Sequence, residues 1–228
     1  PILANEILIG VGNMLINVVL GRQSEEAIAA TAVFRTFEGL VIGFFAGFSN
    51  AASVLVGKEV GAGRLETAWQ RAIRLIYLCM AFIAFVGVAL ILAHDPILRA
   101  MSLSGKSLSI GFGMLCVYGL ASVIRMGNWT HNDTFRSAGD AAYGTILEIA
   151  FMFGMVIPLV WLSGMVWHWD FLLVFACCYA DEPIRFVLMQ RHLYSGKWVQ
   201  PVTPEGQAAL PAFRAVRAGR GIVNSGAK

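Results

Sequence analysis

Charged residues are scarce in this chain, at 14% of 228 residues, whereas 57% of the residues are hydrophobic. Such a composition leaves too little polar surface to cover a soluble protein of this length, so we exclude a water-soluble globular domain. Six long apolar stretches occupy most of the chain, and each is close to the roughly 20 residues that a membrane-crossing helix needs. They are Ile2 to Leu20, Ala27 to Gly57, Ala72 to Ala93, Leu108 to Thr130, Ala141 to Gly164 and Trp167 to Gln190. We therefore predict an all-α polytopic membrane protein, a bundle of six transmembrane helices.

Cysteine and histidine are also few, and their spacing predicts no chemistry. The four cysteines all lie in apolar stretches and form neither a disulfide framework nor a metal-binding pattern: Cys79, Cys116, Cys177 and Cys178. The four histidines have no ligand partner at one-turn spacing, and neither a nucleophile elbow nor a phosphate loop is present. We expect no enzyme, no metal site and no cofactor. The scattered basic residues lack interleaved aromatic residues, so we expect no nucleic-acid partner.

Lysine and arginine favour one side of the predicted bundle. The second-to-third turn, the fourth-to-fifth turn and the tail contain most of them: Lys58, Arg64, Arg71, Arg74, Arg136, Arg191, Lys197, Arg214, Arg217, Arg220 and Lys228. The opposite turns contain Arg22, Arg99 and Lys106. The positive-inside rule then places both termini in the cytoplasm of a plasma (inner) membrane protein.

Residues 1–198 are expected to form the membrane domain, and residues 199–228 a cytoplasmic polar tail. The tail contains Pro201, Pro204 and Pro211, which indicates a mobile or interfacial segment. The chain begins at Pro1 without a basic segment and cleavage site before its first apolar stretch, so we expect missing N-terminal sequence rather than a signal peptide.

Polar residues within the apolar stretches are the best candidates for function, because a charge inside a bilayer is costly and faces a partner or a watery cavity. Asn5 and Glu6 open the first stretch. Glu6 is either a carboxylate in a central cavity that binds protons or cations, or a residue at the helix start that complements the helix dipole.

Arg35 and Glu38 are three residues apart and can pair on one helical face. About 19 apolar or small residues follow Glu38 and could span alone, which favours a pair at the outer interface over a cavity-lining role.

Arg125, Asn128 and Asn132 share another helical face. This face is a substrate or cation path or, as we favour slightly, a hydrogen-bonded seam against neighbouring helices. Glu148 could titrate in a cavity, although pairing with Arg125 is the interpretation we favour.

Prolines mark two of the later helices. Pro158, one turn after Gly154, predicts a kink that is either a hinge or packing relief. Pro183 interrupts the sixth stretch beside Asp181, Glu182 and Arg185, which we expect to form a structural ion-pair cluster.

Several motifs resemble the C-terminal lobe of MATE (multidrug and toxic compound extrusion) transporters. They occur in the right order and spacing from Pro1 to near Trp198: Pro1 to Glu6, Gly21-Arg22 with Ala27 to Ala30, Gly47 to Gly57, Gly61 to Gly63 with Ala68, Phe135 to Asp140, and Tyr143-Gly144. The resemblance implies one lobe of a two-lobed antiporter, which exchanges protons or sodium ions for cationic or amphipathic compounds by alternating access.

The resemblance also implies particular partners and sites. The partners are an N-terminal six-helix lobe, absent from this chain, the lipid bilayer and a small organic substrate. Glu6 resembles the family's acidic residue of the seventh helix. Some members have an acid on the tenth helix where this chain has Arg125 to Asn128, and this departure argues against a sodium site of that type.

Two other functions are compatible with the sequence. A flippase for lipid-linked sugars belongs to the same broad superfamily, and a non-transporting membrane scaffold would use Glu6, Arg125 and Glu148 for packing. Sequence upstream of Pro1 distinguishes a transporter half from a half-size protein, because a transporter needs six further apolar spans.

Overall fold

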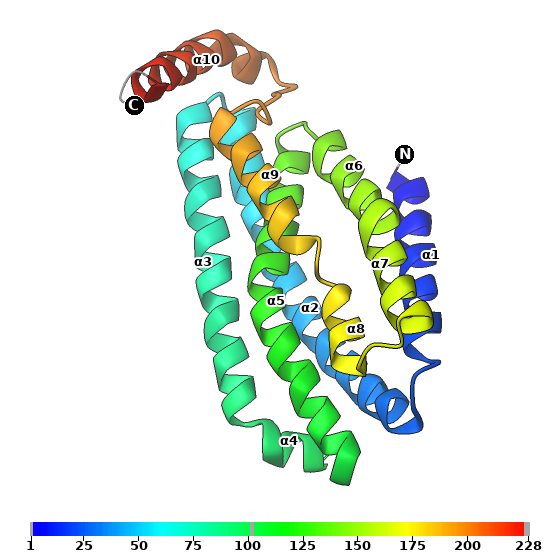
Figure 1. The fold of residues 1–228 in the computed structure, drawn as a ribbon. Coiled ribbons are helices and arrows are strands. Elements are labelled where there is room, and N and C mark those ends of the chain that lie inside the picture. Colours follow the sequence, from blue (N-terminus) through cyan, green and yellow to red (C-terminus); the bar gives the residue numbers. More distant parts are fainter. Residues whose placement is uncertain (1, 101–102, 226–228) are drawn as a thin grey trace.

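The computed structural model describes the backbone of residues 2–100 and 103–225, and side chains from residue 7 to residue 217 within these ranges. The described chain is a helical bundle with one helix lying across its end (Figure 1). The bundle helices are α1 (Ile2–Leu20), α2 (Glu25–Gly61), α3 (Leu65–Leu92), α5 (Gly105–Ser137), α6 (Ala142–Phe151), α7 (Ile157–Trp161), α8 (Phe171–Cys177) and α9 (Glu182–Ser195). Short α4 (His94–Ala100) joins α3 to α5, and α10 (Pro204–Ser225) follows the bundle.

Among the described residues, four continuous helical segments are long and apolar enough to cross a membrane: Glu25–Gly61, Leu65–Leu92, Gly105–Ser137 and Ala142–Val166. The first expected span, α1, is a 19-residue helix of which Ile7–Leu20 is a shorter apolar segment. The sixth expected span is not one helix, because residues 178–181 separate α8 from α9. Asp181 and Glu182 at this break are buried polar residues, and Pro183 lies in the first turn of α9. The described chain is thus all-helical, as predicted, but the segment expected to be the sixth span consists of two short helices.

The fifth expected span is continuous but irregular. Two π-helical turns, Met152–Val156 and Leu162–Val166, flank α7, which contains Pro158 near its start. A π-helical turn widens the hydrogen-bonding pattern by one residue and occurs frequently at functional sites. Around Pro158, where we predicted a kink, the helix therefore departs from regular α-helical geometry in two widened turns.

Helix α5 is the centre of the bundle, since it packs against α2, α3, α6, α8 and α9. Apolar clusters lie along it. One includes Tyr118 with Phe34 and Phe175, another includes Met126 with Phe45 and Ile83, and another, toward α10, includes Phe135 with Met189. The buried polar residues Asn128, His131 and Asn132 lie on α5 between Tyr118 and Phe135, so polar and apolar side chains share this part of the helix.

The tail is a docked helix rather than a loose segment. Phe213 of α10 is buried in the apolar cluster that also contains Trp198, and the Arg217 guanidinium stacks 3.5 Å from the Trp69 ring centroid of α3. Gly139 adopts a positive φ of 100°, and the preceding turn receives a hydrogen bond from Gln200 N to Ala138 O at 2.9 Å. These contacts attach residues 199–217 to the end of the bundle.

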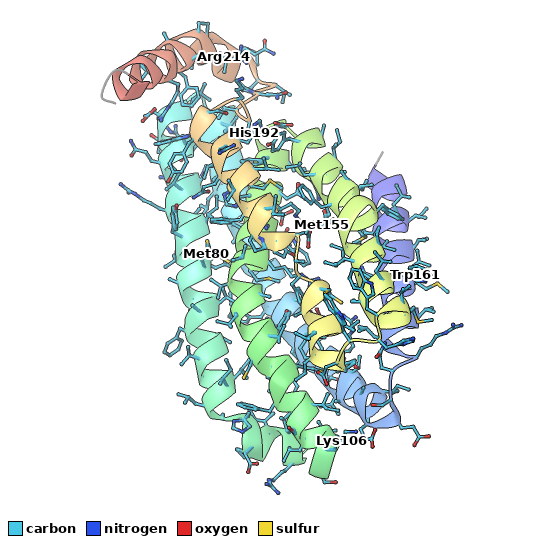
Figure 2. All side chains as sticks on the ribbon, viewed as in Figure 1. Met80, Lys106, Met155, Trp161, His192 and Arg214 are labelled. Atoms are coloured by element: carbon cyan, nitrogen blue, oxygen red, sulfur yellow. The ribbon has the colours of Figure 1, made fainter. Side chains whose placement is uncertain are left out.

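The start of α1 and all of α10 lie at the same end of the bundle (Figure 1). Arg214 and His192 are at this end, whereas Lys106 is at the opposite end (Figure 2). The start of α1 and α10 therefore lie on one side of the bundle (Figure 1); that this side is the cytoplasm stays a prediction.

Candidate functional site

A cavity of about 350 Å³ opens on the side of the bundle formed by α1, α2, α5, α6 and the α8–α9 break. Its wall contains apolar side chains from α1, α2 and the first π-helical turn, including Ile9, Ile16, Ile42, Met152 and Val156. Charged and amide side chains make up much of the remainder: Asn13, Arg35, Arg125, Asn128, Asn132, Asp133, Arg136, Glu148, Asp181, Glu182 and Arg185. Five of the residues that the sequence analysis selected line this cavity: Arg35, Arg125, Asn128, Asn132 and Glu148. Glu38 is buried behind the wall.

Glu38 joins two arginines from different helices. It is 4% exposed and pairs with Arg35 on its own helix, while Arg125 Nη1 of α5 donates to Glu38 Oε1 at 3.0 Å. Arg35 also donates to Asn17 Oδ1 of α1 at 2.7 Å. The predicted Arg35–Glu38 pair is therefore present, and Arg35 lines the cavity, whereas the depth of the pair in a membrane stays a prediction. Arg35 lines the cavity because α5 covers Glu38 and α1 supplies a second acceptor.

Glu182 continues the network to the start of α9. Arg125 Nε lies 3.9 Å from Glu182 Oε1, and Asn128 Nδ2 donates to the Glu182 carboxylate at 2.7 Å and to its carbonyl oxygen at 3.0 Å. Arg185 then pairs with Glu182 at 3.5 Å and with Asp181 at 3.2 Å. Arginines and carboxylates thus alternate from α2 through α5 to α9, and the expected ion-pair cluster at 181–185 is confirmed.

The break between α8 and α9 is held by this network. Its backbone makes short turns, with Tyr179 N donating to Ala176 O and Glu182 N donating to Tyr179 O. Asn128 donates to the Glu182 carbonyl, at the first residue of α9, and so ties α5 to the start of that helix. A discontinuous helix at membrane depth is tolerated where it lines a cavity, and such helices mark binding sites in transporters.

A second polar group lies one to two turns further along α5. Asn132 Nδ2 is 3.4 Å from Glu148 Oε2 of α6, and Ser49 Oγ of α2 donates to Asp133 Oδ2 at 2.6 Å. Arg136 lies 3.9 Å from Asp133. The pairing that we favoured, Glu148 with Arg125, is replaced by contacts of Arg125 with Glu38 and Glu182 and of Glu148 with Asn132. The face of Arg125, Asn128 and Asn132 is both a hydrogen-bonded seam and a cavity wall.

Asn5 and Glu6 fall in the first turns of α1, but their side chains are outside the described residues. The role of Glu6 therefore stays a prediction. Among the described side chains, no group of three or more histidine, cysteine, aspartate or glutamate residues could hold a metal ion.

Sequence reasoning missed Asn17 and Tyr179. Asn13 and Asn17 are four residues apart in an apolar helix, a spacing that could have indicated a polar face. Tyr179 lies under Arg125, with the guanidinium carbon 5.5 Å from its ring centroid, and only its proximity to Asp181 hinted at this contact.

The model of the MatE family matches residues 1–162. The chain belongs to the MatE family. An uncharacterized transporter of Bacillus subtilis (strain 168), YisQ, is 18% identical over 200 residues, which are 88% of this chain and 44% of that protein. The relatives are transporters, in agreement with the expectation that this MATE chain is not an enzyme.

Solved MATE structures have the same fold. One, in complex with MaD3S, superposes with a TM-score of 0.78 at 16% identity over 87% of this chain and 45% of that chain. An outward-facing multidrug resistance MATE family transporter of the MOP superfamily gives 0.77 at 16% identity, over 88% and 45%.

A MOP superfamily transporter from Pyrococcus furiosus, described as having a binding pocket of reverse polarity that suggests a different function, gives 0.78 at 16% identity, over 88% and 44%. The chain thus spans less than half the length of these relatives and has the fold of one part of them.

Proposed function

We propose that this chain forms one lobe of a secondary active antiporter that exports cationic or amphipathic organic compounds in exchange for protons or sodium ions. The observation that carries the proposal is the cavity of about 350 Å³, which combines apolar side chains with charged groups from α2, α5, α6 and α9 inside a bundle of membrane-spanning length. A wall of this kind suits an amphipathic compound, because it contacts the apolar body and orients the polar end.

The proposal includes a second lobe. The cavity lies on one side of the bundle, and the relatives are about twice as long as this chain. In repeat transporters the substrate site lies between two lobes that rock against one another. We propose that the second lobe is encoded before Pro1 and that the assembly lies in the plasma (inner) membrane.

The test uses the complete gene in a strain that lacks its own efflux pumps, with accumulation of a fluorescent amphipathic dye as the readout. We expect lower accumulation with the wild type than with empty vector, and loss of this difference in Glu6→Gln, because the glutamine cannot exchange a proton or bind sodium as a carboxylate does. Glu25→Gln is the matched control, since Glu25 is an exposed first-turn residue of α2. Equal accumulation across a dye panel in wild type and empty vector would contradict the proposal.

A further inference from the structure

The ion pairs that Arg35, Arg125 and Arg136 make on the cavity wall expose the arginines and bury the carboxylates, whereas Arg185 is buried like its partners. In the Glu38 group the side chains of Arg35 and Arg125 are 38% and 26% exposed, whereas that of Glu38 is 5% exposed. Arg136 is 38% exposed and its partner Asp133 is 14% exposed. Both helices therefore present guanidinium groups toward the cavity, with the neutralising carboxylates behind them.

The buried carboxylates are further occupied by hydrogen bonds from inside the bundle. Asp133 accepts from Ser49 Oγ at 2.6 Å, and Glu182 accepts from Asn128 Nδ2 at 2.7 Å. Each of these two carboxylates therefore has a donor from inside the bundle in addition to its arginine partners. The arginines are different, because each guanidinium has five N–H donors in a planar fork.

Glu148 of α6 also lines the cavity. It is half-buried, and Asn132 Nδ2 lies 3.4 Å from its Oε2. The wall therefore presents arginines of α2 and α5 together with this carboxylate of α6. A compound that places an oxyanion against the arginines can place a cationic group near Glu148, so that zwitterions fit as well as anions.

We infer that this lobe selects amphipathic compounds that carry a carboxylate or another oxyanion, with Arg35, Arg125 and Arg136 as the groups that contact it. The inference rests on the proposed function and narrows its substrate class away from simple cations. Guanidinium groups bind carboxylates and phosphates through paired charge-assisted hydrogen bonds, which are the stronger class of hydrogen bond. Tyr179, Met152 and Val156 on the same wall supply contact area for the apolar body.

The experiment compares two dyes that differ in one group. Rhodamine B has a free carboxylate and is zwitterionic at neutral pH, whereas its ethyl ester is a cation with the same ring system. The complete protein is purified and reconstituted, and binding and gradient-driven transport are measured for both dyes, with fluorescein as an anionic third probe. We expect rhodamine B to bind about tenfold more tightly than its ester, the size expected of one charge-assisted contact.

Two substitutions localise the effect without leaving a buried carboxylate unpartnered. Arg35→Gln leaves Glu38 paired with Arg125, and Arg136→Gln leaves Asp133 bonded to Ser49. Each substitution is expected to weaken the binding of rhodamine B about tenfold and the binding of its ester by much less. Arg35→Lys keeps the charge and should recover part of the affinity. The control is Arg99→Gln on α4, whose side chain is 64% exposed and outside the cavity.

The outcomes separate the two proposals. Preferential binding of the ester, or equal losses for both dyes in the arginine variants, would overturn the oxyanion inference even if the dyes are transported. Preferential binding of rhodamine B and fluorescein without gradient-driven transport of any dye would instead overturn the antiporter proposal and support the site. A preference for rhodamine B but not fluorescein would assign the site to zwitterions.

Discussion

Two buried glutamates of α2 have the same local arrangement in two different surroundings. Glu38 and Glu59 are each 4% exposed and each pairs with two arginines. The partners of Glu59 are Arg64, just before α3, and Arg71 on α3, which are 55% and 46% exposed at the end of the bundle near α10. The hydrogen bond to Glu59 raises the pKa of Arg64 above its usual value.

The difference lies in what the arginines connect. Glu59 closes one corner between consecutive helices, so its pairs are local in sequence. Glu38 joins Arg35 to Arg125 of α5, 87 residues away, and through Arg125 and Glu182 to α9. The two glutamates are 21 positions apart, which corresponds to about 31 Å along the helix, close to the thickness of a hydrocarbon core. The same motif therefore stabilises a water-exposed corner at one level and assembles a cavity wall at another.

Glu38→Gln is the substitution with the largest expected effect. It removes the charge shared by two arginines inside the bundle, and breaking a buried pair by removing one partner costs about 3 kcal/mol or more. At 2–4 °C per kcal/mol for a chain of this size, the melting temperature of the purified protein should fall by roughly 10 °C. Glu59→Gln should lower it far less, because its arginines are solvated.

Salt separates the two glutamates further. Exposed pairs are screened within a Debye length of about 8 Å at physiological ionic strength, whereas pairs inside the bundle are screened much less. The fall in melting temperature caused by Glu59→Gln should become smaller from low to high salt, whereas the fall caused by Glu38→Gln should stay the same. Equal losses with equal salt dependence would remove the distinction between the corner and the cavity wall.

Asn128→Ala has the next largest expected effect, because it tests the connection from the cavity wall to the helix break. Asn128 is 0% exposed and donates to both the carboxylate and the carbonyl oxygen of Glu182. Leaving these acceptors without their donor should cost about 2 kcal/mol. Hydrogen exchange of residues 178–185 should accelerate in the variant more than exchange elsewhere.

The control for this prediction is Gln70→Ala. Gln70 is exposed and makes a 3.4 Å contact with Glu66 on the same helix, so its removal should leave exchange at the break unchanged. Acceleration spread evenly over the bundle would show that Asn128 stabilises the fold as a whole rather than the break.

The sequence predicted the helical class and four spans that the described residues contain, because apolar length and turn residues are local signals. It also placed Arg35 beside Glu38, since their spacing decides that contact. It could not assign Glu38 to Arg125 or Asn132 to Glu148, because these contacts depend on how α5 packs against α2 and α6. The cavity-lining position of Arg35 could not be decided from sequence for the same reason: the hydropathy of the residues after Glu38 shows which segment could span a membrane, whereas helix packing determines which side chains line a cavity.

The tail is a second example of contacts that depend on tertiary packing and that the sequence could not predict. Its prolines indicated a mobile or interfacial segment, and the interfacial alternative stays a prediction. Pro204 lies at the first position of α10, where a proline is favourable. Phe213 and Arg217 then dock on side chains of the bundle, a contact that composition cannot indicate.

Arg217→Ala has the smallest expected effect of the three substitutions, because α10 docks on one corner and does not join the cavity network. The variant loses the pair with Glu66 and the stacking on Trp69, together about 1 kcal/mol at a partly exposed site. We expect faster proteolysis of residues 199–217 with a nearly unchanged melting temperature. Arg214→Ala on the exposed face of the same helix should have neither effect. A fall in melting temperature as large as that of Glu38→Gln would instead make α10 part of the bundle's cooperative core, and the contrast between corner and cavity would no longer hold.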